Sequence, residues 1–330
     1  MNRYAHIVGT GSFAPEKVLD NKFFNELLGE DVDEWLTSNL AIKQRHICSE
    51  KESTADLAIE ASRRALKKAN LRPEELDLIL LATDTPEYIS PASSAVVQYK
   101  LGAKNAANFD MNCACAGFVT ALDTAAKYIM SDPAYHNVLV IGAYAMSKYI
   151  DWRDKYTCTI FADGAGAVVL QATDSSGGFL GSKLIADGQY HDYMGIYVGG
   201  THMPVTKENI EEGLHYVRFV KKFPPDTNSR HWPMLVREVA GKVGVAVKDI
   251  DFIIFTQINI NTIREVMGEL QLPIERTHCI MDRYGYTGSA CIPMALDEAV
   301  QQNKIKKGDL LALVGSGGGF SMACDFIRWG

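Results

Sequence analysis

A cysteine flanked by small residues is the strongest candidate for chemistry in this sequence. Cys115 ends an extended run, and a helix is predicted to follow it over 117–130; the run reads Phe109-Asp110-Met111-Asn112-Cys113-Ala114-Cys115-Ala116-Gly117-Phe118. A thiol at a helix N-terminus faces the positive end of the helix dipole, which lowers its pKa and favours the reactive thiolate. Because an isolated cysteine in an apolar segment is usually a small buried side chain, this interpretation depends on a partner elsewhere.

A glycine-rich segment near the C-terminus supplies that partner. It follows a predicted apolar strand over 309–315 and reads Gly315-Ser316-Gly317-Gly318-Gly319-Phe320. Three successive glycines cost backbone entropy that an ordinary turn does not require. They would allow bare backbone N–H groups to approach a thioester carbonyl as an oxyanion hole. Together, the two segments predict nucleophilic acyl transfer.

The elements that position these segments repeat along the chain. Residues 70–81 read like residues 244–255, with Asp77 matching Asp251 at a displacement of 174 residues. Ala121-Leu122-Asp123 matches Ala295-Leu296-Asp297 at the same displacement. Amphipathic helices over 54–70 and 232–243 lead into apolar strands, and further apolar strands follow over 137–142 and 309–315. Continuous apolar strands between helices predict sheets buried on both faces. We infer two similar α/β halves, 1–175 carrying Cys115 and 176–330 carrying the glycine loop.

Bulk composition excludes several classes of protein. A chain of 330 residues that is 47% hydrophobic predicts a globular protein, and its net charge of −7 argues against nucleic-acid binding. No apolar run approaches the ~18–20 residues of a membrane helix, and the start MNRYAHIVGTG has a strand pattern, not that of a signal peptide. Seven scattered cysteines without a C-x-x-C pair favour reduced thiols in the cytoplasm and give a metal site no support.

One long segment departs from the repeat. Residues 186–230 are rich in aromatic and charged side chains and contain Gly199-Gly200 and Pro224-Pro225. Two interpretations stay open: a surface excursion packed on the core, or a wall over the substrate entrance. Its basic cluster, Arg218, Lys221 and Lys222, is either a solvated face or a dock for an acidic carrier protein.

Several further motifs, in order along the chain, make the sequence resemble β-ketoacyl-acyl-carrier-protein synthase III. They are Cys115-Ala116-Gly117-Phe118, Phe161-Ala162-Asp163-Gly164-Ala165-Gly166-Ala167, Asp282-Arg283-Tyr284-Gly285, Ala295-Leu296-Asp297-Glu298-Ala299 and Gly317-Gly318-Gly319-Phe320. The resemblance spans nearly the whole chain. It implies an α/β thiolase fold, with duplicated halves in a five-layered α-β-α-β-α arrangement, and a homodimer. It also implies an acyl group carried on Cys115 from acyl-CoA or an acyl carrier protein, without a cofactor.

The catalytic partners of that cysteine depart from the family pattern. Thr256 stands where the family's Pro-His-Gln-Ala-Asn motif has its His, and Tyr286 stands where its Gly-Asn-Thr motif has its Asn. The backbone N–H groups of Cys115 and Gly318 remain as oxyanion donors. Substrate contacts are expected at Trp35, Ser90, Asn259 and Phe320.

Two changes at the substrate site accompany the replacement of the family's catalytic His and Asn. Asn39 and Asn261 replace basic residues that bind coenzyme A in the family. Ser90 precedes Pro91 at the position that closes the partner subunit's acyl pocket, and its small size predicts a deep pocket for medium or longer chains.

Three functions are compatible with these residues. The leading hypothesis is an enzyme that loads an acyl group on Cys115 and transfers it to a second small-molecule substrate. The second is a decarboxylative synthase in which the hydroxyls of Thr256 and Tyr286 replace the usual pair, although neither titrates near pH 7. The third is a weakened subunit that pairs with an active homologue. A histidine could also enter the site; the candidates are His191, His202, His215 and His231.

The first prediction is that Cys115 is the one essential thiol. Incubation with an acyl thioester should add one acyl mass to the intact protein. Cys115→Ala should abolish the added mass, whereas Cys113→Ala, the matched control two residues away, should not. Labelling that persists in Cys115→Ala would contradict the assignment.

Overall fold

Two buried sheets form the framework of the computed structural model, which describes residues 3–330. The first has the order β1-β7-β6-β4-β5, and β4 runs parallel to β5 and β6. Its strands are β1 (Tyr4–Phe13), β4 (Leu78–Ala82), β5 (Ala107–Met111), β6 (Asn137–Ala145) and β7 (Asp163–Thr173). The second has the order β11-β12-β13-β8, with β11 parallel to β12. Its strands are β8 (Gly178–Ala186), β11 (Phe252–Phe255), β12 (Leu310–Gly317) and β13 (Ser321–Arg328).

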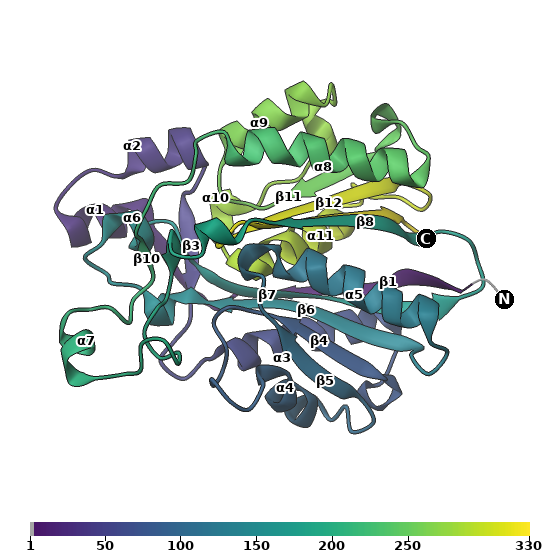
Figure 1. Cartoon of the computed structure of the whole chain (residues 1–330), viewed down its shortest axis with the longest axis horizontal. Coiled ribbons are helices and arrows are strands. Elements are labelled where there is room, and N and C mark those ends of the chain that lie inside the picture. The colour runs from purple at the N-terminus through teal and green to yellow at the C-terminus, as the bar shows by residue number, and fades with distance from the viewer. Residues whose placement is uncertain (1–2) are drawn as a thin grey trace.

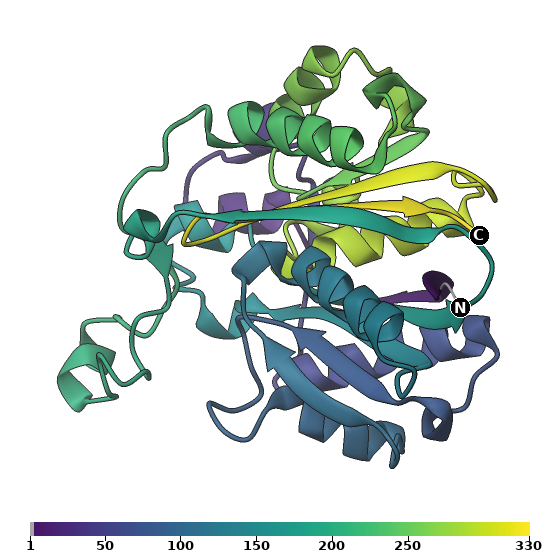
Figure 2. The ribbon, with the colours of Figure 1, turned by 45° about the vertical axis from the view of Figure 1, so that its right-hand side comes forward.

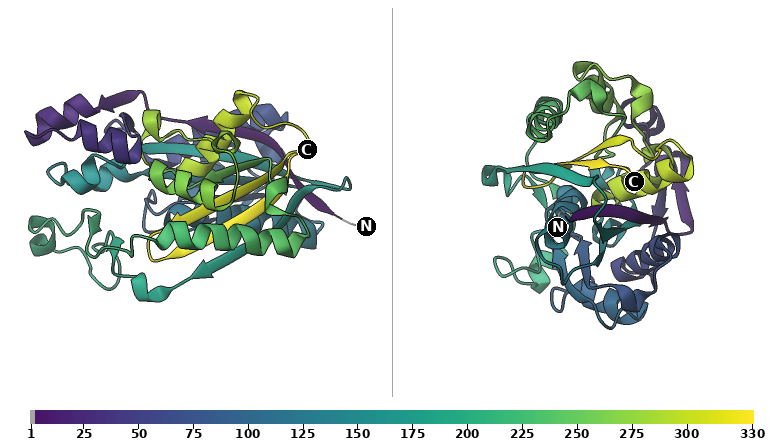
Figure 3. Two further views of the ribbon diagram at one scale, coloured as in Figure 1. Left: turned by 90° about the horizontal axis from the view of Figure 1, so that it is seen from above. Right: turned by 90° about the vertical axis from the view of Figure 1, so that its right-hand side faces the viewer.

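Helices separate and cover these sheets in five layers (Figures 1 and 3). The central pair, α5 (Gly117–Ser131) and α11 (Cys291–Gln301), contacts both sheets. The outer layers are α3 (Thr54–Ala69) with α4 (Ser93–Leu101) on the first sheet, and α8 (Thr227–Val243) with α9 (Ile260–Glu269) beyond the second. Every residue of β4 and β6 is buried, as their continuous apolar runs predicted. Within residues 3–330, no helix has the length and apolar character needed to cross a membrane.

The predicted 174-residue repeat is present element by element. It relates β4 to β11, the 3₁₀ turns η2 (Pro73–Glu75) and η6 (Val247–Asp249), and η3 (Ala114–Ala116) and η8 (Gly288–Ala290). The helices α5 and α11 also begin 174 residues apart, at Gly117 and Cys291. The strand β5 is an exception: at 281–285, where it would repeat, the structure has the helix α10 (Met281–Tyr284), and a parallel bridge joins Ile253 to the preceding Thr277. The division between residues 175 and 176 falls in the turn between β7 and β8 and stays a prediction.

Smaller elements gather at one end of the sheets (Figure 1). They are β2 (Lys17–Asp20), α1 (Asn21–Leu28), α2 (Asp33–Trp35), the π-helical turn η1 (Leu36–Leu40), β3 (Gln44–Ile47), η4 (Met146–Tyr149), α6 (Lys155–Cys158) and α10 (Met281–Tyr284). The segment 186–230 crosses the same end through the ribbon of β9 (Met194–Gly195) and β10 (Arg218–Phe219), while α7 (Lys207–Glu211) stands away from the body (Figure 2). The helix expected from residue 232 begins earlier, at Thr227, because the end of this segment continues into it.

The glycines of β7 permit the close contact between the first sheet and α11. A Cβ on Gly166 would lie 2.6 Å from the backbone nitrogen of Met294, and one on Gly164 would lie 2.6 Å from the Met294 sulfur. Such distances leave no room for a side chain. The Phe161–Ala167 motif therefore serves sheet packing.

Gly166→Ala should lower the free energy of unfolding by about 1–3 kcal/mol, because the added methyl group forces β7 and α11 apart. Gly241→Ala is the matched control. That glycine lies in α8, and a Cβ added to it would have nothing within 4 Å, so alanine should be neutral or stabilise the helix by about 0.5–1 kcal/mol. Chemical denaturation of both variants measures the difference; equal stabilities would contradict the packing assignment.

Candidate active site

Cys115 lies in the short turn that joins β5 to α5. Ala114 has a left-handed conformation with φ 46°, and the Asn112 side chain accepts a hydrogen bond of 3.1 Å from its amide. The amide of Ala116 donates to the carbonyl of Cys113 at 3.1 Å. Since a positive φ is uncommon for alanine, the turn is strained, as is frequent at functional sites. Cys115 is 5% exposed, and all seven cysteines are free thiols.

The glycine hairpin between β12 and β13 packs directly on this turn. A Cβ on Gly317 would lie 2.5 Å from the carbonyl oxygen of Cys113 and 2.8 Å from the amide nitrogen of Cys115. Gly319 and Phe320 have positive φ angles of 73° and 57° and reverse the chain. Gly317 thus brings backbone without a side chain directly against the Cys115 turn, while the approach of backbone N–H groups to a thioester carbonyl stays a prediction. Gly318 faces the same cavity as Cys115, and its role as an oxyanion donor stays a prediction.

A cavity of about 390 Å³, which we call the entrance cavity, leads from the surface to the cysteine. It brings together seven of the eight residues expected from the sequence: Trp35, Cys115, Thr256, Asn259, Tyr286, Gly318 and Phe320. The segment 186–230 contributes Met194, Phe219, Phe223, Pro224 and Pro225 to its lining. Of the two interpretations of this segment, the wall over the entrance is the one that agrees with the structure.

Neutral amides surround the mouth of the entrance cavity. Trp35 is 55% exposed there, and its carbonyl accepts a hydrogen bond of 2.9 Å from the side chain of Asn39. The Asn261 side chain lies 3.4 Å from the Asn39 carbonyl and 3.3 Å from Arg264 Nη1. Arg264, one turn further along α9, thus places a positive charge beside Asn39 and Asn261, which replace basic residues of the family. Sequence reasoning missed Arg264, because its proximity to Asn261 depends on the helix α9, which was not predicted.

The hydroxyl of Thr256 is occupied by the neighbouring strand. It accepts a hydrogen bond of 2.9 Å from the amide of Ser316 and lies 3.4 Å from the carbonyl of the same residue. Thr256 is 1% exposed and sits directly after β11. Its hydroxyl therefore stabilises the β11–β12 junction as an acceptor, and its own proton makes only the long contact with the Ser316 carbonyl. Asn259 is similarly engaged, because its side-chain oxygen caps α9 by accepting from the amides of Asn261 and Thr262.

Tyr286, in contrast, is directed at the nucleophile. Tyr286 and Cys115 both line the entrance cavity, and hydrogen bonding to the Tyr286 hydroxyl lowers the pKa of the Cys115 thiol. The backbone of Tyr286 pairs with the first half of the chain: the amide donates to Ile160 at 3.0 Å, and the carbonyl accepts from Ala162 at 2.9 Å. Gly285 before it has φ 65°, and a Cβ there would lie 2.8 Å from Arg45 Cγ. Only glycine fits this bend, which orients the ring of Tyr286.

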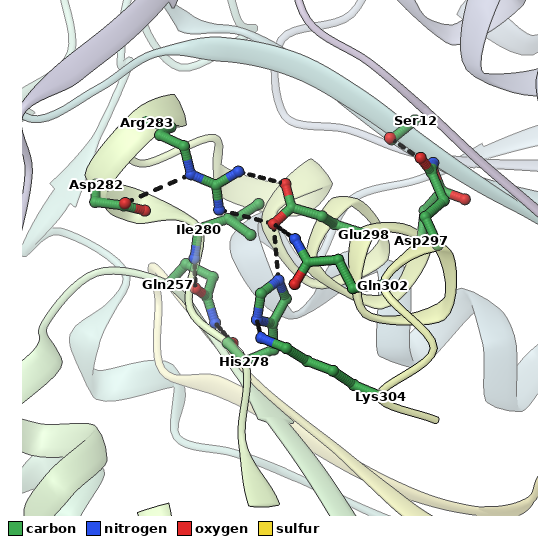
Figure 4. Close-up of polar contacts among 11 residues, drawn as sticks. Ser12, Gln257, His278, Ile280, Asp282, Arg283, Asp297, Glu298, Gln302 and Lys304 are labelled. Carbon is green, nitrogen blue, oxygen red and sulfur yellow. Dashed lines mark hydrogen bonds and ion pairs between the residues drawn. The ribbon is translucent and has the colours of Figure 1, made fainter. Parts of the chain in front are cut away.

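A buried polar network joins the segments that carry Thr256 and Tyr286 (Figure 4). The side chain of Gln257 donates to the carbonyl of His278 at 3.2 Å and accepts from the amide of Ile280 at 2.9 Å. Glu298 of α11 accepts 2.7 Å hydrogen bonds from both terminal nitrogens of Arg283 and lies 2.9 Å from His278. Burial alone would raise the pKa of Glu298, but His278 and Arg283 lower it to about 2. The paired carboxylate anchors both segments to α11.

The expectation of a lowered pKa for Cys115 is wrong for the structure without substrate. Burial raises the pKa of this thiol well above its ordinary value, and the carboxylate of Asp84 raises it further. The hydrogen bond from Tyr286 opposes both effects. Burial is the largest of these effects and favours the neutral thiol over the thiolate.

A second cavity, of about 330 Å³, also has Cys115 in its lining and reaches the exposed residues Asn112 and His191; we call it the inner cavity. It shares Cys115, Met194 and Gly318 with the entrance cavity but is also lined by Asp84, Asn112, Met146, His191 and Tyr197. Of the four candidate histidines, His191 alone lines a cavity with Cys115 among the described residues, and it is exposed. Asp84 was missed by sequence reasoning, although it follows β4 by two residues, as a residue at the functional edge of a sheet would.

Ser90 is the one expected site residue that lines neither cavity. It is exposed and precedes Pro91 through a cis peptide bond, beside Ile89, which is 82% exposed. Its expected function concerns a partner subunit, so it stays a prediction.

Tyr286→Phe should slow alkylation of Cys115 by iodoacetamide about tenfold at a fixed pH near 8. Loss of a hydrogen bond to the thiolate, about 1.5–3 kcal/mol, raises the pKa of the thiol and lowers the thiolate fraction. Thr256→Val is the matched control and should change the rate little, since its hydroxyl bonds to Ser316. A rate that falls equally in both variants would contradict the assignment of Tyr286.

Comparison with known proteins agrees with this geometry. The family model described as 3-oxoacyl-[acyl-carrier-protein (ACP)] synthase III matches residues 109–188, and the model of its C-terminal part matches residues 241–329. The beta-ketoacyl-[acyl-carrier-protein] synthase III of Caldanaerobacter subterraneus subsp. tengcongensis is 41% identical over 325 residues, which cover 98% of both chains.

Solved structures are similar over nearly the whole chain. The 3-oxoacyl-[acyl-carrier-protein] synthase III from Aquifex aeolicus VF5 has a TM-score of 0.89 at 35% identity, covering 98% of this chain and 100% of its own. The priming beta-ketosynthase of the R1128 polyketide pathway has a TM-score of 0.89 at 27% identity, covering 99% and 97%. The expected thiolase fold is therefore confirmed, and the chain belongs to the 3-oxoacyl-[acyl-carrier-protein] synthase III family of transferases.

Proposed function

We propose that this protein loads an acyl group on Cys115 from acyl-CoA or an acyl carrier protein and transfers it to a second substrate without decarboxylating malonate. The observation that carries the proposal is the state of the two partner positions. The Thr256 hydroxyl accepts a hydrogen bond from the amide of Ser316, while Tyr286 lines the same cavity as Cys115 and lowers the pKa of its thiol. Neither position offers the imidazole or amide that polarises a malonyl thioester in the family.

The loading step is a thioester exchange. The Cys115 sulfur attacks the acyl carbonyl carbon, and the oxyanion that forms accepts hydrogen bonds from the amides of Cys115 and Gly318. The carbon–sulfur bond to the carrier then breaks, and the carrier thiolate takes up the proton that Cys115 releases. Because the resting thiol is neutral, this proton moves with the exchange and not before it. Tyr286 stabilises the negative charge that develops on the Cys115 sulfur as its proton leaves.

The transfer step reverses these roles. An incoming amine, alcohol or pre-formed carbanion attacks the acyl carbon, and the Cys115 sulfur leaves as a thiolate stabilised by the hydroxyl of Tyr286. The proton that an amine or alcohol loses is available to that sulfur, which restores the resting thiol. No separate base is required for this balance, in keeping with the absence of a histidine at position 256.

The decarboxylative alternative has specific support. The synthases similar to this chain bear beta-ketoacyl synthase names, and the hydroxyl of Tyr286 lines the cavity where an enolate oxygen would form. We rank it second because removal of one oxyanion donor typically costs on the order of 10²-fold in rate. A weakened partner subunit ranks third, since a scaffold would need neither Cys115 nor the hairpin packed against its amide.

The acyl chain and the assembly are further parts of the proposal. A homodimer with Ser90 at the partner's pocket would accept medium or longer chains in preference to acetyl. The basic side chains of Arg218 and Lys222 would attract an acidic carrier protein, whereas Lys221 is already paired with Asp192 at 2.6 Å. Loading measured across a chain-length series, together with light scattering, tests the pocket and the dimer.

Carbon dioxide release separates the two enzymatic hypotheses. With Cys115 pre-loaded, malonyl-CoA or malonyl carrier protein should release carbon dioxide on the order of 10²-fold more slowly than with a family member that retains His and Asn. The double variant Thr256→His with Tyr286→Asn should release it faster and transfer the native acyl group more slowly. Release at the ordinary family rate, lost in Thr256→Val or Tyr286→Phe, would overturn the proposal in favour of decarboxylation.

A further inference from the structure

The inner cavity is polar at the position where an acyl chain would lie. Two of its lining groups have a buried atom without a hydrogen-bond partner among residues 3–330: Asp84 Oδ1 and the hydroxyl of Tyr197. Buried polar atoms in proteins are nearly always paired, because an unpaired one costs about 1–3 kcal/mol. Two such atoms in one cavity beside a nucleophile indicate that a ligand supplies their partners.

Asp84 is the stronger of the two groups. It lies two residues beyond β4, and its side chain is close enough for its charge to raise the pKa of Cys115, Tyr144 and Tyr149. Burial raises the pKa of Asp84 itself to about 6, against a smaller lowering by a hydrogen bond from its own backbone. No cation contributes to that balance. The carboxylate therefore faces the cavity without a compensating charge.

The position of the inner cavity decides which substrate meets Asp84. The entrance cavity contains Trp35, Thr256 and Tyr286, the positions where the family resemblance places the carrier and the acceptor. The inner cavity contains none of these three residues and shares Cys115, Met194 and Gly318 with the entrance cavity. An acyl group attached to the sulfur, with its carrier in the entrance, extends into the inner cavity. Asp84 consequently meets the acyl group and not the acceptor.

We infer that Asp84 is a specificity-determining residue that selects acyl groups bearing a hydrogen-bond donor, a hydroxyl or an amino group, close to the thioester. The inference rests on the proposed loading of Cys115 and adds the substrate class. An aliphatic acyl chain would leave both Asp84 Oδ1 and the Tyr197 hydroxyl unpaired, whereas a hydroxyl group can donate to the first and accept from the second. A site built for a hydrogen bond discriminates strongly against an analogue that lacks the partner.

The test is the rate at which Cys115 of the full-length protein is acylated, followed by intact mass. Butyryl-CoA, 3-hydroxybutyryl-CoA and 3-aminobutyryl-CoA have the same chain and differ only in the substituent. At pH 8, at least one substituted thioester should load about tenfold or more faster than butyryl-CoA. Asp84→Val should remove this preference. Asp84→Asn keeps an acceptor oxygen without the charge, so it should retain preference for the hydroxyl group and lose preference for the amino group.

Asp174→Asn is the matched control, because it makes the same charge change at an exposed site between β7 and β8 and should leave the ratios unaltered. The near-isosteric Asp84→Asn variant keeps the test available if Asp84→Val does not fold. Equal loading of all three thioesters by the unmodified protein, or ratios that persist in Asp84→Val, would overturn this inference alone. Failure of every thioester to acylate Cys115 would overturn the proposed function and this inference with it.

Discussion

The contact between the Gly317 backbone and the Cys115 turn is the constraint on which the rest of this site depends. The nucleophile comes from the first sheet and the hairpin from the second, so the two halves must meet without side chains between them. A Cβ on Gly317 would lie 2.8 Å from the Cys115 amide nitrogen. This contact fixes the separation of the two layers at their common edge, and the central helices α5 and α11 hold that separation along the remaining length.

Electrostatics at the site follow from the same close packing. Cys115 and Tyr286 are excluded from water, and burial raises the pKa of both. Burial favours the neutral thiol of Cys115 and the neutral phenol of Tyr286. A negative charge on the sulfur therefore becomes favourable only when a thioester substrate takes up part of it. The Thr256 hydroxyl accepts a hydrogen bond within the β11–β12 junction, so the two partner positions differ in role. The Tyr286 hydroxyl faces Cys115, and the Thr256 hydroxyl stabilises the fold.

Cys115 lines both of the cavities that could hold substrates. The entrance cavity has an aromatic and proline wall from the segment 186–230 and carries neutral amides at its mouth. The inner cavity presents Asp84 and Tyr197 with unpaired polar atoms. The fold is that of the family, whereas the residues at positions 256 and 286 differ from the family motifs. A shared fold therefore does not by itself fix the substrates.

The sequence by itself determined the repeat, the buried strands and the glycine hairpin, and it predicted Cys115 as the nucleophile, because each depends on local pattern: apolar periodicity, a fixed displacement, or residues with small or absent side chains. It also identified Thr256 and Tyr286 through their place in known motifs. Only the tertiary structure decided what these residues do, because hydroxyl partners and pKa values depend on neighbours distant in the chain. The amide of Ser316, 60 positions after Thr256, donates a hydrogen bond to the Thr256 hydroxyl. Asp84 raises the pKa of Cys115 for the same reason: burial brings together charges that no local pattern relates.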